Sequence, residues 1–162
     1  SALKKSEHVC YLAPESSYSK GLYKKVLEKD LWNHLAPELK SPRAGLSGKV
    51  FKTYTNDKTI RTLQMAVLPN KVSRNNSPTR KEWLYKHSSS IGQHQHSTVV
   101  IVLDNEDHYA AAAAAVARHS RLFSAKSGKQ KPKQTFHIVA IDSKANVIAA
   151  SPQVIAGAES VA

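Results

Sequence analysis

The sequence predicts an α/β domain with a mixed β-sheet sandwiched between helices. Predicted strands and helices alternate along its 162 residues in the order βαββαβαββα, a pattern typical of that fold class. The run 98–103, Thr-Val-Val-Ile-Val-Leu, is apolar on both faces, as an interior parallel strand is. Hydrophobic residues make up 41% of the chain, which is enough for a core, and the length suits one domain.

A strand, a helix and a hairpin are expected in the first half of the chain. The apolar run 8–13, closed by Pro14, predicts the strand. Leucines and a valine at helical spacing predict one helix over 22–35, with lysines on its other face. The alternating segment 49–55 predicts a half-buried strand. A polar turn then leads to a longer strand over 59–68, so that the two form a hairpin.

A second helix and a buried strand are expected next. Ser77 is the expected N-cap, and Pro78 the first residue, of a helix that runs to about His87. Segment 88–97 is polar and is expected to be exposed. The strand over 98–103 is expected inside the sheet, covered on both sides.

An alanine-rich helix and a second hairpin follow. The helix is expected over 109–122, and its six consecutive alanines favour helix and give it a thin packing face. Carboxylates within 104–107 precede it and interact favourably with its positive end. Segment 135–141 predicts another buried strand, and 146–150 predicts a short strand paired with it as a hairpin.

The last residues have the pattern of a helix start. Ser151 is the expected N-cap, Pro152 suits the first helical position, and the apolar residues of 154–162 share one face. Such a face needs a surface to pack against. One interpretation is a short helix docked on this domain, and the other is that the chain is one piece of a longer protein.

Two clusters and one thiol are candidates for chemistry. His94 and His96 are spaced as His-x-His, but no cysteine or carboxylate lies near them, and we interpret them as exposed loop histidines. Cys10, on a predicted strand, is interpreted as a buried and inert thiol. The second cluster combines three carboxylates with a histidine: Asp104, Glu106, Asp107 and His108. Its place at a helix N-terminus explains the carboxylates without a metal, and we assign no catalytic, metal or cofactor-binding residue.

The charge of the chain raises a separate question. Lys and Arg number 24 against 12 Asp and Glu, so the formal net charge is +12, a value that favours a nucleic acid or another anionic partner. The basic groups are dispersed, and no helix-turn-helix, zinc-finger or aromatic sheet motif is present. The densest group is a candidate anion-binding loop with four lysines: Lys126, Lys129, Lys131 and Lys133. No aromatic residue is interleaved there, and we interpret it as an exposed basic loop.

Composition and motifs exclude several classes of protein. A single Cys rules out an internal disulfide. No apolar run approaches the roughly 18 residues needed to cross a bilayer, so a soluble chain without a membrane partner is expected. The sequence has no Gly-x-Ser-x-Gly elbow, no Walker loop and no Gly-x-Gly-x-x-Gly. With six glycines in all, a phosphate-cradling loop is not expected.

One segment resembles a known family. The run 68–78, Leu-Pro-Asn-Lys-Val-Ser-Arg-Asn-Asn-Ser-Pro, resembles a Leu-Pro-x-x-Val-Ser-Arg-x-Asn-Ser-Pro run in the leucine aminopeptidase (cytosol aminopeptidase) family. That run lies in the N-terminal domain of the branch called probable aminopeptidase-like proteins. Leu31-Trp32 and the Arg-Leu-Phe-Ser of 121–124 are similar to that branch in the same order. The resemblance covers most of the chain.

The resemblance implies a non-catalytic N-terminal domain over 1–150, with a macro-domain-like fold, and the start of an interdomain helix over 151–162. The parent would be a metal-dependent leucyl aminopeptidase that removes N-terminal residues from peptides, as a cytoplasmic hexamer. Its catalytic domain would bind the peptide and two divalent metals, zinc or manganese. The catalytic signature Asn-Thr-Asp-Ala-Glu-Gly-Arg-Leu is absent here, so no catalytic or metal residue carries over. This domain would then support assembly or regulation.

An interpretation from another class stays open. A free-standing basic module would bind RNA or another anionic partner, with an affinity that falls steeply as salt rises. An organellar location is open as well, because the sequence starts at Ser1 and a removed presequence would leave no trace.

Overall fold

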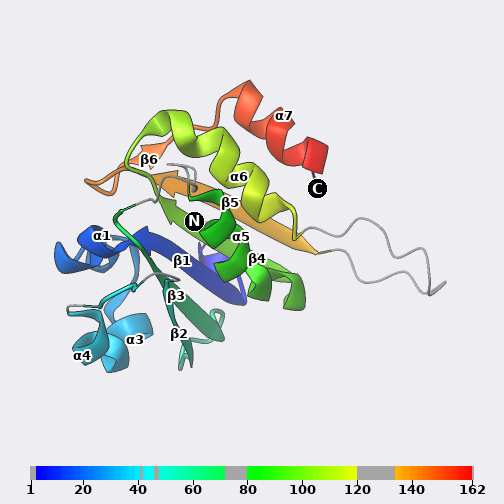
Figure 1. Cartoon of the computed structure of the whole chain (residues 1–162). Coiled ribbons are helices and arrows are strands. Elements are labelled where there is room, and N and C mark those ends of the chain that lie inside the picture. Colours follow the sequence, from blue (N-terminus) through cyan, green and yellow to red (C-terminus); the bar gives the residue numbers. More distant parts are fainter. Residues whose placement is uncertain (1–2, 41, 46–47, 72–79, 120–133, 162) are drawn as a thin grey trace.

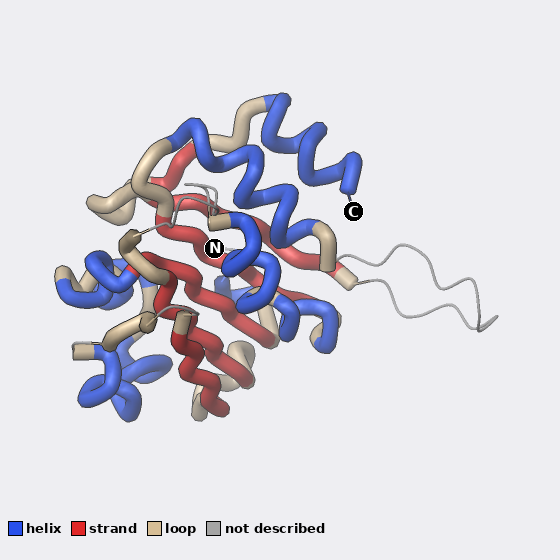
Figure 2. The backbone as a smooth tube through the Cα atoms, viewed as in Figure 1, coloured by secondary structure: helices blue, strands red, loops and turns tan. Residues whose placement is uncertain are grey.

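The described part of the chain forms one six-stranded sheet with helices on both faces (Figures 1 and 2). The structure is a computed structural model, and it describes all residues except 1–2, 41, 46–47, 72–79, 120–133 and 162. The predicted α/β class with a mixed sheet is confirmed. The strands are β1 (His8–Pro14), β2 (Lys49–Tyr54), β3 (Thr62–Leu68), β4 (His96–Val102), β5 (Thr135–Ile141) and β6 (Val147–Ile148).

The sheet has a parallel interior and antiparallel edges. Its order is β2-β3-β1-β4-β5-β6, in which β3, β1, β4 and β5 run parallel while β2 and β6 run antiparallel to their neighbours. The first strand of the sequence therefore lies inside the sheet, where His8 aligns with Thr62 of β3 and Ser97 of β4. The two predicted hairpins, β2–β3 and β5–β6, are confirmed.

Two groups of helices cover the two faces of the sheet. One face carries α1 (Glu15–Ser19), α2 (Tyr23–Val26), α3 (Lys29–Trp32), η2 (Asn33–Leu35) and α4 (Ala36–Leu39). The other carries α5 (Lys81–His87), η3 (Ser89–Gln93), α6 (Tyr109–Ala117) and α7 (Pro152–Val161). Two further 3₁₀ turns are η1 (Leu3–Lys5) and η4 (Glu106–His108).

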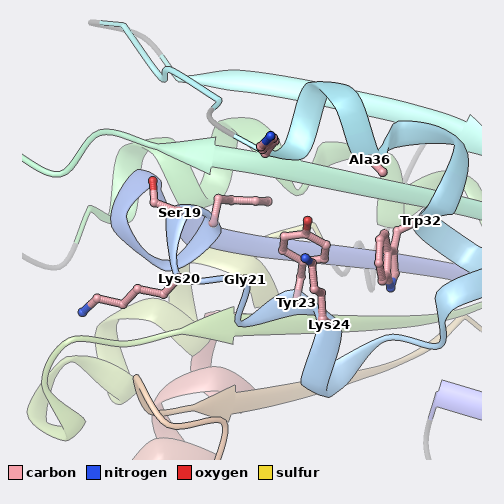
Figure 3. A pocket seen from close by; sticks show the side chains of 9 residues that line it. Ser19, Lys20, Gly21, Tyr23, Lys24, Trp32 and Ala36 are labelled. Atoms are coloured by element: carbon pink, nitrogen blue, oxygen red, sulfur yellow. The ribbon is translucent and has the colours of Figure 1, made fainter.

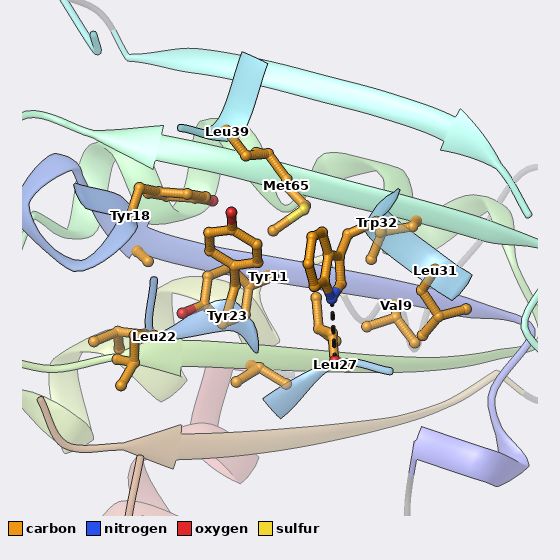
Figure 4. Packing of buried hydrophobic residues seen from close by; sticks show 14 of the residues in the cluster. Val9, Tyr11, Tyr18, Leu22, Tyr23, Leu27, Leu31, Trp32, Leu39 and Met65 are labelled. Atoms are coloured by element: carbon orange, nitrogen blue, oxygen red, sulfur yellow. Dashed lines mark hydrogen bonds between the residues drawn. The ribbon is translucent and has the colours of Figure 1, made fainter. Parts of the chain in front are cut away.

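Aromatic side chains fill the core under the first group of helices (Figure 4). The rings of Tyr11 and Tyr18 meet edge to face with centroids 5.7 Å apart, and those of Tyr23 and Trp32 do so at 5.1 Å. Edge-to-face contacts of this kind suit the quadrupoles of the rings. Leucines from the loops and helices close the remaining space.

The prediction of a single helix over 22–35 is wrong. The chain there forms three short helical pieces, because Leu27 and Glu28 are extended (ψ 139° and 144°) and interrupt the helix. The Trp32 indole N–H donates to the carbonyl of Leu27, at the break, at 3.2 Å. The leucine face is nevertheless buried, as its spacing predicted: Leu22, Leu27 and Leu31.

The alanine-rich helix lies between the sheet and the last helix. Ala112 and Ala113 of α6 are buried, and their small side chains allow close approach. The expected N-cap of α7 is confirmed, since the backbone N–H of Val154 donates to the Ser151 hydroxyl at 3.3 Å. Helix α7 runs beside α6 (Figure 1) and buries Val154 there, which agrees with a helix docked on this domain.

Three other predictions need correction or qualification. Segment 88–97 is not uniformly exposed, because η3 turns Ser90 and Ile91 into the protein. Strand β5 is buried only toward its end, at Ala140 and Ile141. Helix α5 begins at Lys81, after Arg80 in a left-handed conformation (φ 54°), whereas the expected start at 77–78 lies outside the described residues.

Candidate functional site

The two histidines of the His-x-His pair do not converge on one point. His96 is exposed at the start of β4, while the ring of His94 stacks on that of His8 with centroids 4.4 Å apart. Within the described residues, no group of three or more His, Cys, Asp or Glu side chains is placed to hold a metal ion.

The carboxylate cluster and the cysteine each have a structural role. Asn105 caps η4, its side chain accepting from the Asp107 N–H at 2.9 Å, and Asp104 pairs with Arg80. The Cys10 thiol is buried and donates to the His87 carbonyl at 3.7 Å. Burial raises the pKa of this thiol to about 12, so it stays protonated and unreactive at neutral pH.

The candidate anion-binding loop lies outside the described residues. Its four lysines belong to the segment 120–133: Lys126, Lys129, Lys131 and Lys133. The binding of anions by this loop stays a prediction.

The structure instead assembles a buried polar network around His8, which sequence reasoning missed. His8 Nδ1 lies 2.7 Å from the Thr62 hydroxyl of β3, and Nε2 lies 2.9 Å from the Ser90 hydroxyl of η3. The Ser90 hydroxyl in turn donates to Gln64 Oε1 at 2.6 Å, and the Gln64 amide donates to the His87 carbonyl. The network fixes η3 and the end of α5 against β1 and β3.

The hydrogen-bond directions define the state of His8. The single proton of Ser90 goes to Gln64, so Ser90 can only accept from His8, and Nε2 carries the ring proton. Thr62 then donates to Nδ1. Burial is the main reason that the pKa of His8 falls to about 3, and the nearby His94 and Lys52 lower it further. A neutral ring with both nitrogens occupied is a structural element and not a proton carrier.

A second arrangement joins the ends of three parallel strands. Ser16, Asn70 and Asp104 each lie two residues beyond the carboxyl end of β1, β3 and β4. The Asn70 side chain accepts from the Ser16 N–H at 2.9 Å. Arg80 donates to the Pro69 and Asn70 carbonyls at 2.9 and 3.0 Å and to Asp104 at 2.8 Å.

We call this set the Arg80 anchor: Ser16, Pro69, Asn70, Arg80 and Asp104. It holds the first two residues after β3 and the residue before α5, which flank the undescribed segment 72–79. The distinctive run 68–78 thus starts at the anchor. The run is recognisable in the sequence, but its contact with Arg80 is not. Asp104, which pairs with Arg80, lies 24 residues further along the chain, so no local pattern connects the two.

The fold first defines a class, the mixed α/β domain with helices on both faces of the sheet. A model of the M17 aminopeptidase N-terminal domain 2 matches residues 20–129, more than half of the chain. The chain therefore belongs to the N-terminal domains of the M17 aminopeptidase family, and the predicted resemblance is confirmed. A search of curated proteins finds no match.

Solved structures share the fold at low sequence identity. An M17 aminopeptidase from Trypanosoma brucei superposes with a TM-score of 0.66 at 17% identity, over 97% of this chain and 32% of that one. Leucyl aminopeptidase from Leishmania major, solved with actinonin, gives 0.64 at 20% identity, over 83% of this chain and 26% of that one. Leucine aminopeptidase from Caenorhabditis elegans gives 0.53 at 18%, over 86% and 28%. This chain therefore spans between a quarter and a third of the length of these enzymes.

In the part of the chain that the structure describes, no helix is long and apolar enough to span a membrane.

Proposed function

We propose that this chain is the non-catalytic N-terminal domain of a metal-dependent leucyl aminopeptidase. The match of the family model to residues 20–129 is the observation that carries the proposal. The parent enzyme removes N-terminal residues from peptides. Its peptide substrate and two divalent metals, zinc or manganese, are bound by residues outside this chain. Two metal ions in such a site activate a water for attack on the peptide bond.

The domain is proposed to support assembly of a cytoplasmic, hexameric enzyme, or its regulation. A non-catalytic role is supported by two buried titratable groups of the core: His8 is neutral and bonded at both ring nitrogens, and Cys10 is inert. The helix at 151–162 is proposed as the start of the connection to the catalytic domain. In the structure α7 packs on α6.

The isolated chain is expected to hydrolyse no leucyl-amide substrate. The assay uses purified chain with added manganese or zinc, and a full-length leucyl aminopeptidase in the same buffer shows that the conditions permit turnover. The expected result is a rate equal to that without protein. Hydrolysis that follows the chain through successive purification steps and disappears with chelator would overturn the proposal.

The native polypeptide is expected to be about three times as long as this chain, as the solved enzymes are. Antibodies raised against the 17.8 kDa chain and denaturing mass spectrometry of the captured protein measure its length. A native polypeptide of 17.8 kDa would favour the alternative of a free-standing binding module.

A further inference from the structure

Three lysines surround a pocket between the short helices on the first face of the sheet. The cavity has a volume of about 390 Å³, and its walls come from α1, the turn after it, α2, α3 and α4. Lys20, Lys24 and Lys40 are exposed at its rim, and Tyr18, Tyr23 and Trp32 contribute aromatic surface. Figure 3 shows Tyr23, Lys24 and Trp32 side by side, with Lys20 extending away from them.

The charges of these lysines are not compensated. No acidic residue is among the described residues that line the cavity. Within the described residues, the ion pair of the protein joins Arg80 and Asp104, and none of the three lysines takes part in one. The nearby carboxylate of Glu15 in α1 is engaged elsewhere, because its Oε2 accepts a hydrogen bond from the Ala44 N–H with an N–O distance of 3.1 Å. Like charges around one cavity repel each other. An anion bound among them attracts each ammonium group and so offsets this repulsion.

The aromatic residues hold Lys24 and leave recognition to the lysines. The Lys24 ammonium lies 5.9 Å from the centroid of the Tyr23 ring and 5.8 Å from that of Trp32, within the range of a cation–π contact. The polar atoms of Tyr18 and Trp32 are already occupied, since they donate to the carbonyls of Ala66 and Leu27. What these two rings offer the cavity is therefore apolar surface, and the ammonium groups are the donors.

The turn after α1 completes the wall. Gly21 has a φ of +66°, which residues with a side chain rarely adopt, and the turn there places residues on both of its sides, Lys20 and Lys24, in the wall of the cavity. The lysines of 20–29 looked like one solvated helix face in the sequence. In the structure Lys24 lines the cavity while its neighbour on α2, Lys25, does not.

We propose that this pocket binds a small molecule with two or more oxyanion groups. A lining whose charged residues are all lysines suits a ligand of multiple negative charge, and the cavity volume suits a small molecule. The charge can come from phosphate or from carboxylate groups, which share this chemistry. The proposal does not depend on the aminopeptidase assignment, because it rests on the geometry of this pocket alone.

Calorimetric titration of the chain with pyrophosphate and with citrate, at 150 mM salt, tests the proposal. Saturable binding of one or both probes with a 1:1 stoichiometry is expected, and the tighter probe identifies the preferred group. Saturation with neither probe would overturn the proposal, because general charge attraction is largely screened at that salt concentration.

The variants Lys24→Gln and Lys25→Gln form a matched pair on α2 with the same change of charge. Loss of an ammonium contact is expected to weaken binding about tenfold for Lys24→Gln, whereas Lys25→Gln stays within about twofold of the unmodified chain. Lys40→Gln, at the residue after α4, is expected to follow Lys24→Gln and tests the site without touching the cation–π contact. Equal weakening in Lys24→Gln and Lys25→Gln would overturn the site in favour of diffuse attraction by net charge.

Discussion

His8 is the residue whose surroundings say most about this domain. It is fully buried, it stacks on His94, and its two ring nitrogens are bonded to Thr62 and Ser90. Each of these contacts can form with the neutral imidazole ring. Burial disfavours the protonated, charged ring. The network therefore stabilises the fold only while His8 is unprotonated.

Acid is expected to destabilise the domain through this residue. The pKa of His8 is about 3 in the folded chain and 6.5 when unfolded, so the unfolded state binds the proton first. The stabilisation is complete above pH 6.5 and is lost as the pH falls toward 3. At 1.36 kcal/mol per pKa unit, the free energy of unfolding contributed by His8 falls by about 2 kcal/mol between pH 7.5 and pH 5.

Urea unfolding at the two pH values measures this loss. The variant His8→Asn is expected to be less stable at both, but its free energy of unfolding should fall by about 2 kcal/mol less between them. His137→Asn, at an exposed histidine of β5, is the control and should keep the full dependence. An unchanged dependence in His8→Asn would show that other groups carry the acid sensitivity.

At the scale of elements, the Arg80 anchor joins the strand ends that the sequence keeps apart. Its guanidinium reaches two backbone carbonyls and one carboxylate, and Arg80 itself adopts a left-handed backbone conformation at the start of α5. The three bonds differ in value. The Arg80 side chain is 11% exposed and that of Asp104 is 52% exposed, so water weakens the ion pair more than the bond to the carbonyl of the buried Pro69.

The substitution Arg80→Met is expected to lower the free energy of unfolding by about 2 kcal/mol, since the hydrogen bonds of a charged donor to the Pro69 and Asn70 carbonyls are lost. Asp104→Asn is expected to cost about 0.5 kcal/mol, the usual value of an exposed pair. Thermal and urea unfolding of both single variants and of the double variant gives the coupling between them. A coupling as large as the whole Arg80→Met effect would contradict the assigned role of the carbonyls.

Local patterns predicted the strands well and the short helices poorly. The alternating segment 49–55 and the apolar run 98–103 became β2 and β4 because strand burial follows directly from side-chain order. The leucine spacing of 22–35 fits a continuous helix and a broken one equally, since Leu22, Leu27 and Leu31 are buried in either case. The difference between them is the extended backbone at Leu27 and Glu28, which side-chain periodicity does not reveal.

The sites depended on contacts too distant in sequence to predict. His8 meets a partner 54 residues away in Thr62 and another 82 residues away in Ser90, and only the sheet brings them together. The pocket lysines were visible as charges but not as neighbours. What the sequence did predict was the family, through one loop motif, and the family model confirms it.

At the scale of the whole molecule, the chain is an assembled α/β domain that matches a quarter to a third of much longer enzymes. Its core has two separate halves, one on each face of the sheet, and neither includes an accessible reactive group among the described residues. The net charge of +12 finds one local expression in the three lysines of the pocket. A ligand bound there would reach the helices of the first face, on the side of the sheet opposite to α7.

The position of β1 also governs how the domain is made. Translation produces this strand first, yet its partners on either side begin 54 and 89 residues later, at Thr62 and Ser97. The growing chain must therefore keep the apolar strand His8–Pro14 unpaired until β3 and then β4 have left the ribosome. Long-range pairing of this kind slows folding and leaves a hydrophobic edge exposed meanwhile. The sheet is completed only when β3 and β4 pair with β1, the strand that is synthesised before them. Until then, the nascent domain depends on protection from aggregation.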